Sequence, residues 1–200
     1  MTITIHSGLF RGMKLVSPEG QTARPTLSRV REAVLNAMGP RLGGAQVADL
    51  FAGTGAWGIE ALSRGAKACV FVERDRKVLY ALRQNLEELH RRAMAQNLPE
   101  PATKLHSSDL EACLAQVLEA GPYDIVWGDP PYAEAAAWAE LLAPHALRLV
   151  TPGGMLALES GKEAAAAVAA VFARSKVLCV DRQRNYGDTV ISMFVRGDSE

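Results

Sequence analysis

Short apolar runs alternate with helical patterns along the chain from Gln46 onward. A buried strand is a run of roughly 4–8 apolar residues, whereas an amphipathic helix repeats its apolar positions about every 3.6 residues. The apolar runs predict strands over 46–51, 68–73, 103–106, 123–128, 155–160, 176–181 and 189–195. The helical patterns predict helices over 56–64, from Asp75 towards 92, after Asp109, over 133–149, and in the alanine-rich segment after residue 160.

Turn and capping residues separate these segments. Gly65 follows the first helix, and Asp75 can cap the second, which the prolines of 97–101 end. Residues 151–154 (TPGG) predict a turn before the fifth strand, and 186–188 (YGD) predict a hairpin loop between the last two. The alternation predicts an α/β fold: a Rossmann-like, mostly parallel seven-stranded sheet with helices on both faces and a C-terminal antiparallel hairpin.

The composition is that of an ordinary globular protein. The 200 residues are 48% hydrophobic and 22% charged with a formal net charge of zero, so charge over the whole chain does not indicate a nucleic-acid-binding protein. The three cysteines include no CxxC pair and support neither a zinc site nor a disulfide framework. Because we find no signal-peptide pattern and no apolar run of membrane-spanning length, we expect a cytoplasmic protein. We also expect no metal, because no cluster of metal ligands is visible in the sequence.

The first 45 residues differ from the rest in charge. They hold six arginine or lysine residues against two glutamates, an excess of four positive charges. We therefore expect a basic N-terminal extension over 1–45, packed on a domain over 46–200.

The first strand of that domain leads into a glycine-rich loop, DLFAGTGAWG, over residues 49–58. Glycines at 53, 55 and 58 satisfy GxGxxG, and Glu73 ends the next strand, where a carboxylate can accept the ribose hydroxyls of an adenosine. Together they predict an adenosine-containing cofactor; a tight strand–helix turn beside a surface glutamate is the alternative. Asp49 favours a cationic group, such as the amino group of S-adenosylmethionine, because it would repel a pyrophosphate. Asp109 can accept from an adenine amino group, cap the helix that begins at Leu110, or do both.

The fourth strand ends in Asp129-Pro130-Pro131-Tyr132, the most specific motif in the chain. The exocyclic amine of a base is a poor nucleophile because its lone pair is delocalised into the ring. The Asp129 carboxylate and the Pro130 carbonyl can favour a pyramidal nitrogen and stabilise positive charge as a methyl group arrives. The ring of Tyr132 can stack on an extruded base. A Pro-Pro turn that merely ends the strand is the alternative.

Several motifs together resemble a known family. DLFAGTGAWGIEALSRGA, FVERD and DPPY resemble class I S-adenosylmethionine-dependent methyltransferases that act on exocyclic amines. RGMKL (11–15), RPTLSRVREAVLNAM (24–38) and NYGDT (185–189) extend the resemblance to the bacterial 16S rRNA guanine-N2 methyltransferase family known as RsmD. The resemblance covers nearly the whole chain. It implies methylation of the N2 amino group of guanine 966 in 16S rRNA, with S-adenosylhomocysteine as product and a small ribosomal subunit or assembly intermediate as substrate.

The resemblance also implies roles for single residues. Cofactor contacts fall on Asp49, Phe51, Gly53, Gly55, Glu73, Arg74, Asp109 and Leu110. The base is handled by Asp129, Pro130 and Tyr132. RNA contacts from the basic extension fall on Arg11, Lys14, Arg24, Thr26, Arg29 and Arg31, of which Arg29 and Arg31 can also form an ordinary solvated helix face.

The sequence departs from the family pattern at Met13, Ser28, Thr54 and Gly128, none of which removes a group with an assigned chemical role. Three other functions stay open on the residues alone. They are an adenine-N6 methyltransferase, an NAD-dependent oxidoreductase built on GxGxxG, and a non-catalytic ribosome assembly factor that retains a cofactor fold. A monomer is the default expectation.

Overall fold

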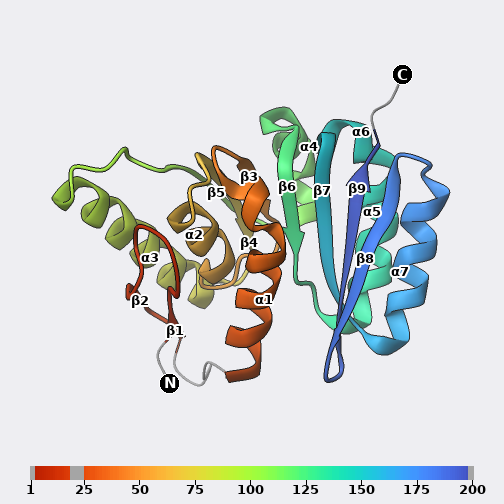
Figure 1. Cartoon of the computed structure of the whole chain (residues 1–200), viewed down its shortest axis with the longest axis horizontal. Coiled ribbons are helices and arrows are strands. Elements are labelled where there is room, and N and C mark those ends of the chain that lie inside the picture. Colours follow the sequence, from red (N-terminus) through yellow and green to blue (C-terminus); the bar gives the residue numbers. More distant parts are fainter. Residues whose placement is uncertain (1–2, 19–24, 198–200) are drawn as a thin grey trace. The chain divides into compact units, whose positions relative to one another are not determined.

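The structure is a computed structural model that describes residues 3–18 and 25–197, with side chains in the second stretch from Ser28 onward. The chain divides into two compact units, Met1–Leu110 and Glu111–Glu200. Each unit combines helices with strands (Figure 1).

The first unit carries the parallel strands whose ends hold the predicted cofactor residues. Its elements are β1 (Ile3–Thr4), β2 (Lys14–Leu15), α1 (Pro25–Leu42), β3 (Gln46–Asp49), α2 (Ala56–Ser63), β4 (Ala68–Glu73), α3 (Arg76–Ala95) and β5 (Ala102–Ser107). β1 and β2 pair antiparallel, while β4 pairs in parallel with β3 on one side and β5 on the other. Parallel strands end at one edge of a sheet, so the ends of β3, β4 and β5 lie along the same edge.

Two helices of this unit follow the predicted patterns. α2 is almost wholly buried, and α3 presents an exposed face opposite its buried one. The side chain of Asp75 accepts hydrogen bonds from the backbone N–H groups of Lys77 and Val78 at 2.8 and 3.1 Å, which confirms it as the cap of α3.

The N-terminal residues pack on α2 and α3. The backbone N–H groups of Leu9 and Phe10 donate to the carbonyl and the hydroxyl of Ser63 at 2.7 and 2.9 Å. The buried Asn85 side chain on α3 accepts from the backbone N–H of Val16 at 2.7 Å and donates to its carbonyl at 3.0 Å. These contacts make residues 3–18 part of the first unit.

The second unit ends in an antiparallel hairpin. Its elements are α4 (Leu110–Ala120), β6 (Tyr123–Gly128), the 3₁₀ turn η1 (Tyr132–Glu134), α5 (Ala135–Leu142), the 3₁₀ turn η2 (Ala143–His145), α6 (Ala146–Leu149), β7 (Val150–Gly161), α7 (Lys162–Arg174), β8 (Leu178–Tyr186) and β9 (Thr189–Arg196). β6 and β7 are parallel, while β9 pairs antiparallel with β7 and β8. α7 covers one face of the β9–β8 pair, where the rings of Phe172 and Phe194 lie 4.6 Å apart in a tilted arrangement.

The seven strands of the larger sheet have the order β5-β4-β3-β6-β7-β9-β8. The predicted α/β class, with a mostly parallel sheet and antiparallel C-terminal strands, is confirmed. The segment 133–149 is helical as predicted, and η2, where Pro144 lacks a backbone N–H, separates α5 from α6. One local prediction is wrong. Residues 151–154 lie within β7 and do not form a turn before it, although Gly153 adopts a positive φ of 69° there.

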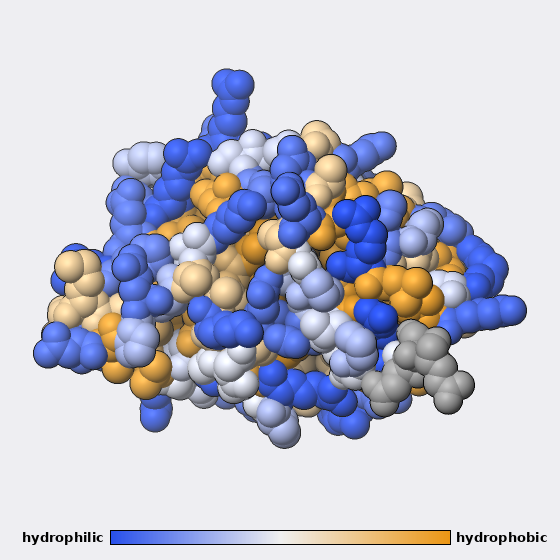
Figure 2. Space-filling view, turned by 90° about the horizontal axis from the view of Figure 1, so that it is seen from above, coloured by the Kyte–Doolittle hydropathy of each residue, from blue (hydrophilic) through white to orange (hydrophobic). Residues whose placement is uncertain are grey.

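Hydrophilic residues predominate on the face drawn in Figure 2, with small groups of hydrophobic residues between them. Within residues 3–18 and 25–197, no helix is both long and apolar enough to cross a membrane. The same residues contain no cluster of three or more histidine, cysteine or acidic side chains that could hold a metal ion. Cys69, Cys113 and Cys179 form no disulfide with one another.

Candidate cofactor and base sites

Asp49, the last residue of β3, is a buried acid with one unpaired oxygen. Only 1% of the residue is exposed. Its Oδ2 accepts from the backbone N–H of Gly58 at 3.0 Å, whereas Oδ1 has no hydrogen-bond partner among the described residues. Burial, assisted by the negative charge of Glu73, raises the pKa of Asp49 to about 7, against the opposing effect of the backbone N–H groups of Gly58 and Phe51. A buried acceptor without a partner is costly, so Oδ1 is suited to a donor or cation that a ligand brings.

Glu73, the last residue of β4, ties its strand to the glycine-rich loop. Its Oε2 accepts from the backbone N–H of Gly53 at 2.9 Å. Its Oε1 accepts from the N–H groups of Arg74 and Asp75, both at 2.7 Å. Since each carboxylate oxygen accepts about two hydrogen bonds, the remaining capacity lies at Oε2. A ribose that bound through both hydroxyls would therefore have to displace the N–H of Gly53.

The glycines of the loop serve two purposes. Gly53 has a φ of +55°, and no heavy atom lies within 4 Å of the position that a Cβ would take, so a ligand can approach the backbone closely. Gly58 instead allows tight packing: a Cβ there would lie 2.3 Å from Cε1 of Phe71 and 2.8 Å from Sγ of Cys69. The loop thus combines an open backbone surface with a helix held close to β4.

The remaining predicted cofactor residues lie around the same strand ends. The Nη1 of Arg74 is 2.8 Å from Oδ2 of Asp109, just after β5. Leu110 is buried at the start of α4, and Phe51 is partly exposed in the loop after β3. Asp109 therefore already accepts a hydrogen bond from the Arg74 guanidinium. An adenine amino group that bound Asp109 would have to share this carboxylate with Arg74 or displace it.

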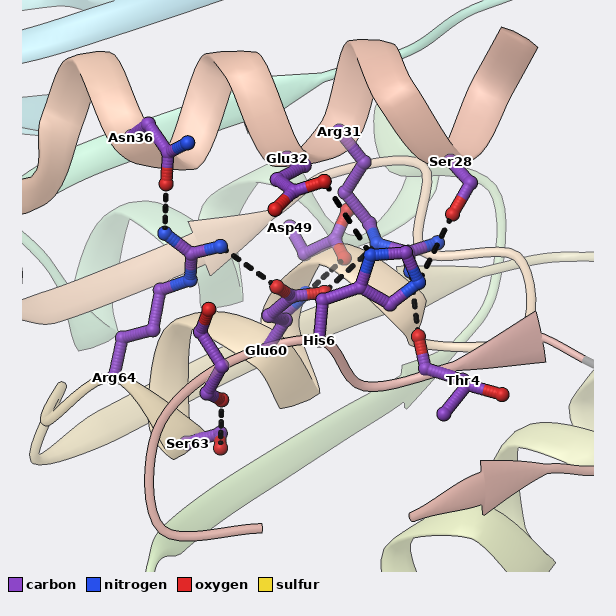
Figure 3. A network of polar contacts seen from close by, with 12 residues as sticks. Thr4, His6, Ser28, Arg31, Glu32, Asn36, Asp49, Glu60, Ser63 and Arg64 are labelled. Carbon is purple, nitrogen blue, oxygen red and sulfur yellow. Dashed lines mark hydrogen bonds and ion pairs between the residues drawn. The ribbon is translucent and has the colours of Figure 1, made fainter. Parts of the chain in front are cut away.

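A buried ionic network joins α1 to α2 (Figure 3). Glu60 of α2 is fully buried, and its Oε2 accepts from Nε of Arg31 at 3.1 Å while Oε1 accepts from Nη2 of Arg64 at 2.8 Å. Arg31 also donates through Nη2 to the carbonyl of Thr4 at 2.9 Å. Its side chain is 12% exposed. The guanidinium that we expected to contact RNA is thus engaged in holding α1 and β1 against α2.

The other predicted RNA contacts vary in accessibility. Arg11, Lys14 and Arg29 are exposed. Arg24 lies outside the described residues, as does the side chain of Thr26. Of the departures from the family pattern, Met13 is buried in the core, and Oγ of Ser28 lies 3.2 Å from Nε2 of His6. The exposed arginines and lysine remain available for phosphate contacts.

The DPPY motif follows β6 in the second unit. Asp129 is exposed, Pro130 is buried, and Tyr132 begins η1 with 40% of its surface exposed. The negative charge of Asp129 is close enough to Tyr132 to contribute to the raised pKa of its phenol, although burial is the largest cause. An accessible carboxylate and a partly exposed aromatic ring therefore lie together after this strand.

Two buried side chains hold the hydroxyl of Tyr132. The hydroxyl donates to Oε1 of Glu159 on β7 at 2.9 Å and is also hydrogen-bonded to Oγ1 of Thr189 on β9. Because its single proton goes to Glu159, the Thr189 hydroxyl is the donor in the second bond. A Cβ at Gly161 would lie 3.3 Å from Cδ2 of Tyr132, so the ring also rests on that backbone. Burial raises the pKa of Glu159.

Sequence reasoning missed Glu60, Glu159, Asn85 and the role of Thr189. Each acid stands alone in an apolar segment, WGIEAL for Glu60 and MLALES for Glu159, which is a usable signal for a buried, paired carboxylate. Thr189 closes NYGDT, but nothing in that motif indicates that it contacts Tyr132. Asn85 lies in a polar helical pattern, and only the fold reveals that its Nδ2 donates to the Thr54 carbonyl at 2.8 Å.

Comparisons with known proteins agree with this geometry. The family model described as "Conserved hypothetical protein 95" matches residues 3–195. "Ribosomal RNA small subunit methyltransferase D" of Escherichia coli K12 is 37% identical over 158 residues, which are 79% of this chain and 71% of that protein. "Putative rRNA methyltransferase YlbH" of Bacillus subtilis is 35% identical over 159 residues, 78% of this chain and 82% of the relative.

A solved structure extends the similarity to the whole fold. "Putative methyltransferase yhhF from Escherichia coli" superposes with a TM-score of 0.76 at 28% identity, covering 100% of both chains. The family model spans far more than half of the residues, and two relatives exceed 30% identity over more than two thirds of their length. The chain therefore belongs to the conserved hypothetical protein 95 family, the class I S-adenosylmethionine-dependent methyltransferases that include ribosomal RNA small subunit methyltransferase D and YlbH.

Proposed function

We propose that this protein transfers a methyl group from S-adenosylmethionine to the exocyclic N2 amino group of a guanine in 16S rRNA, at position 966 by family resemblance. The substrate is a small ribosomal subunit or an assembly intermediate of it. The observation that carries the choice of cofactor is the buried Oδ1 of Asp49, which lacks a hydrogen-bond partner among the described residues.

The residues at the ends of β3, β4 and β5 fit this cofactor. Its ammonium group would satisfy Oδ1 of Asp49, whereas the pyrophosphate of a nicotinamide dinucleotide would meet a repelling carboxylate. Glu73 would hold the ribose through Oε2, and the open backbone at Gly53 leaves room for close approach. When bound, S-adenosylmethionine supplies the methyl group on a positively charged sulfonium.

The DPPY residues would prepare the guanine amine. The Asp129 carboxylate and the Pro130 carbonyl would accept hydrogen bonds from the amine and favour a pyramidal nitrogen, since its lone pair must leave the ring system to attack. Formation of the N–C bond would break the bond between the methyl carbon and the sulfonium sulfur and leave S-adenosylhomocysteine. The nitrogen, cationic after the transfer, would then lose a proton to Asp129 or to water. Tyr132 would stack on the extruded base through its exposed ring.

Exposed basic residues of the N-terminal segment would contact RNA phosphates. Arg11, Lys14 and Arg29 are accessible for this role, and Arg24 and Thr26 join them by resemblance. We assign Arg31 a positioning role instead, because its guanidinium bonds Glu60 and the Thr4 carbonyl. These few cations would provide limited affinity for RNA. The shape of the small ribosomal subunit would therefore supply part of the recognition.

The decisive experiment is transfer of a labelled methyl group to small subunits that lack the modification, followed by nucleoside mass spectrometry. N2-methylguanosine is the expected product. Label on adenine would refute the guanine assignment and favour adenine-N6 chemistry. Cofactor binding without any transfer would favour the assembly factor.

The role of Asp129 is tested separately with Asp129→Asn. Loss of one charged acceptor at the reacting nitrogen should lower turnover roughly 100-fold or more. The affinity for S-adenosylmethionine should be nearly unchanged. Glu163→Gln, which neutralises an exposed acid on α7 of the same unit, is the matched control and should leave turnover intact. Equal turnover of both variants would contradict the proposed chemistry.

A further inference from the structure

The β8–β9 hairpin carries two exposed arginines that no part of the proposed mechanism uses. Arg182 and Arg184 lie on β8, the edge strand of the sheet, whose only strand partner among the described residues is β9 (Figure 1). Both are exposed. Nε of Arg182 is 3.8 Å from Oδ2 of Asp181, a long and partial ion pair. Arg184 forms no ion pair with any described carboxylate.

The strand register sets the sheet face on which these arginines lie. Residues directly opposite each other in an antiparallel pair share a face. Arg184 pairs with Ile191, and Ile191 pairs on its other side with Glu159. Arg182 pairs with Met193, two residues beyond Ile191 and therefore on the same face. Both arginines thus share a sheet face with Glu159.

The side chains of the opposite face confirm this assignment. Gln183, between the two arginines, donates through Nε2 to the hydroxyl of its partner Ser192 at 2.9 Å. Phe194, two residues after Ser192, meets Phe172 of α7. Gln183 therefore faces α7, and Arg182 and Arg184 face the other way.

Tyr132 belongs to the face that carries the arginines. Its hydroxyl is held by Glu159 and by Thr189, and Thr189 lies two residues from Ile191 on the same side of β9. With neighbouring strands about 4.8 Å apart, Arg184 lies two strands, or about 10 Å, from Glu159 in one cross-strand row. The proposed base platform and the two cations thus lie along one surface of the hairpin.

We propose that Arg182 and Arg184 bind phosphates of the RNA strand that flanks the target base. This inference rests on the proposed function, because Tyr132 fixes where that base would stack. A base extruded onto Tyr132 brings its neighbouring phosphates to the same surface, and arginine forms bidentate hydrogen bonds with phosphate oxygens. The alternative is that the charges only prevent edge-to-edge pairing of β8 with another chain.

Binding to small ribosomal subunits tests the proposal without depending on turnover. The double variant Arg182→Gln/Arg184→Gln should weaken binding several-fold at moderate salt. Loss of two phosphate contacts on a single strand should flatten the plot of log affinity against log salt by about 1.4. Arg182→Lys/Arg184→Lys should retain most of the affinity and the slope. Arg174→Gln, on the exposed surface of α7, is the matched control and should behave like the wild type.

The outcomes separate this inference from the proposed function. An unchanged affinity and salt slope in the glutamine variant overturns it, even if the wild type methylates guanine. Self-association of that variant with normal RNA binding also overturns it, in favour of edge protection. The wild type could also bind subunits through these arginines and transfer no methyl group. That result would support the RNA-binding role of Arg182 and Arg184 and refute the proposed reaction. Thermal unfolding of each variant checks that the hairpin remains folded.

Discussion

The hydroxyl of Tyr132 donates to Oε1 of Glu159 at 2.9 Å, joining the last residue of the DPPY motif to a carboxylate on β7 of which only 4% is exposed. Thr189 completes the contact from β9. A tyrosine side chain that is free to rotate loses conformational entropy when a base stacks on it, whereas a ring already fixed at its hydroxyl does not. Glu159 and Thr189 therefore pre-organise the ring on which the proposed function depends.

Replacing the partners of Tyr132 should slow methyl transfer modestly. One hydrogen bond contributes about 1 kcal/mol, which corresponds to roughly a fivefold change in rate. We expect Glu159→Gln, Thr189→Val and Tyr132→Phe each to lower kcat/KM by a few-fold. Adding Glu159→Gln to Tyr132→Phe should cost little more, because the hydroxyl through which Glu159 acts is already absent. If Glu159→Gln and Tyr132→Phe lowered kcat/KM by independent factors that multiply in the double variant, Glu159 would not act by positioning Tyr132.

The raised pKa of Asp49 makes the stability of the apo-protein depend on pH. In the unfolded chain an aspartate titrates near 4, whereas in the folded apo-protein the pKa of Asp49 is about 7. Between these values the folded state binds more protons than the unfolded state. The contribution of Asp49 to the free energy of unfolding therefore falls as pH rises from about 4 to 7. Asp49→Asn removes this contribution, so its urea-unfolding profile should be flatter over that range.

The cofactor should show the opposite trend. Under the proposed function its ammonium group would bind the ionised form of Asp49, so affinity should rise several-fold between pH 6 and 7.5 as the carboxyl with a pKa of about 7 loses its proton. Calorimetric titration with S-adenosylhomocysteine measures this directly. Asp49→Asn controls for protonation of the ligand itself and should bind weakly at every pH. The same pH dependence in both proteins would rule out Asp49 as the partner of the ammonium.

The sequence predicted the ends of the parallel strands better than the contacts that hold those ends together. Asp49, Gly53 and Glu73 could be located because a parallel sheet brings the ends of successive strands to one edge, and local patterns are enough to find those ends. The contacts of Arg31 could not be predicted from the sequence, for a physical reason. A basic residue on a helix has the same local pattern whether it faces solvent or a buried acid, and its partner Glu60 lies 29 positions later in the chain. Thr189 and Tyr132 are 57 positions apart, and only tertiary structure joins them.

Glu60 and Glu88 each pair with two arginines, but their substitution should change the free energy of unfolding by very different amounts. Glu60 is fully buried between Arg31 and Arg64, whereas Glu88 pairs with Arg91 and Arg92 on the outer face of α3. Glu60→Gln leaves two poorly hydrated guanidinium groups without their counter-charge and should lower the free energy of unfolding by about 3 kcal/mol or more. Glu88→Gln should lower it by less than about 1 kcal/mol, because water screens that pair. Urea denaturation of the two variants measures the difference.

The close packing of α2 against β4 can be tested by comparing alanine substitutions at Gly58 and Gly43. An alanine methyl at Gly58 would lie 2.3 Å from Cε1 of Phe71, so α2 must move away from β4. We expect Gly58→Ala to lower the free energy of unfolding by about 1–3 kcal/mol. It should also weaken cofactor binding, because the Gly58 N–H that holds Oδ2 of Asp49 moves with the helix.

Gly43→Ala is the control for the loss of glycine flexibility. No heavy atom lies within 4 Å of its Cβ position, and its φ is not positive, so the alanine meets neither a clash nor backbone strain. It should leave stability unchanged or raise it by up to about 1 kcal/mol by restricting the unfolded chain. Urea denaturation and cofactor titration of both variants distinguish the two cases. Wild-type stability and cofactor affinity in Gly58→Ala would show that the loop tolerates a wider helix–strand spacing and that close packing of α2 is not what positions Asp49.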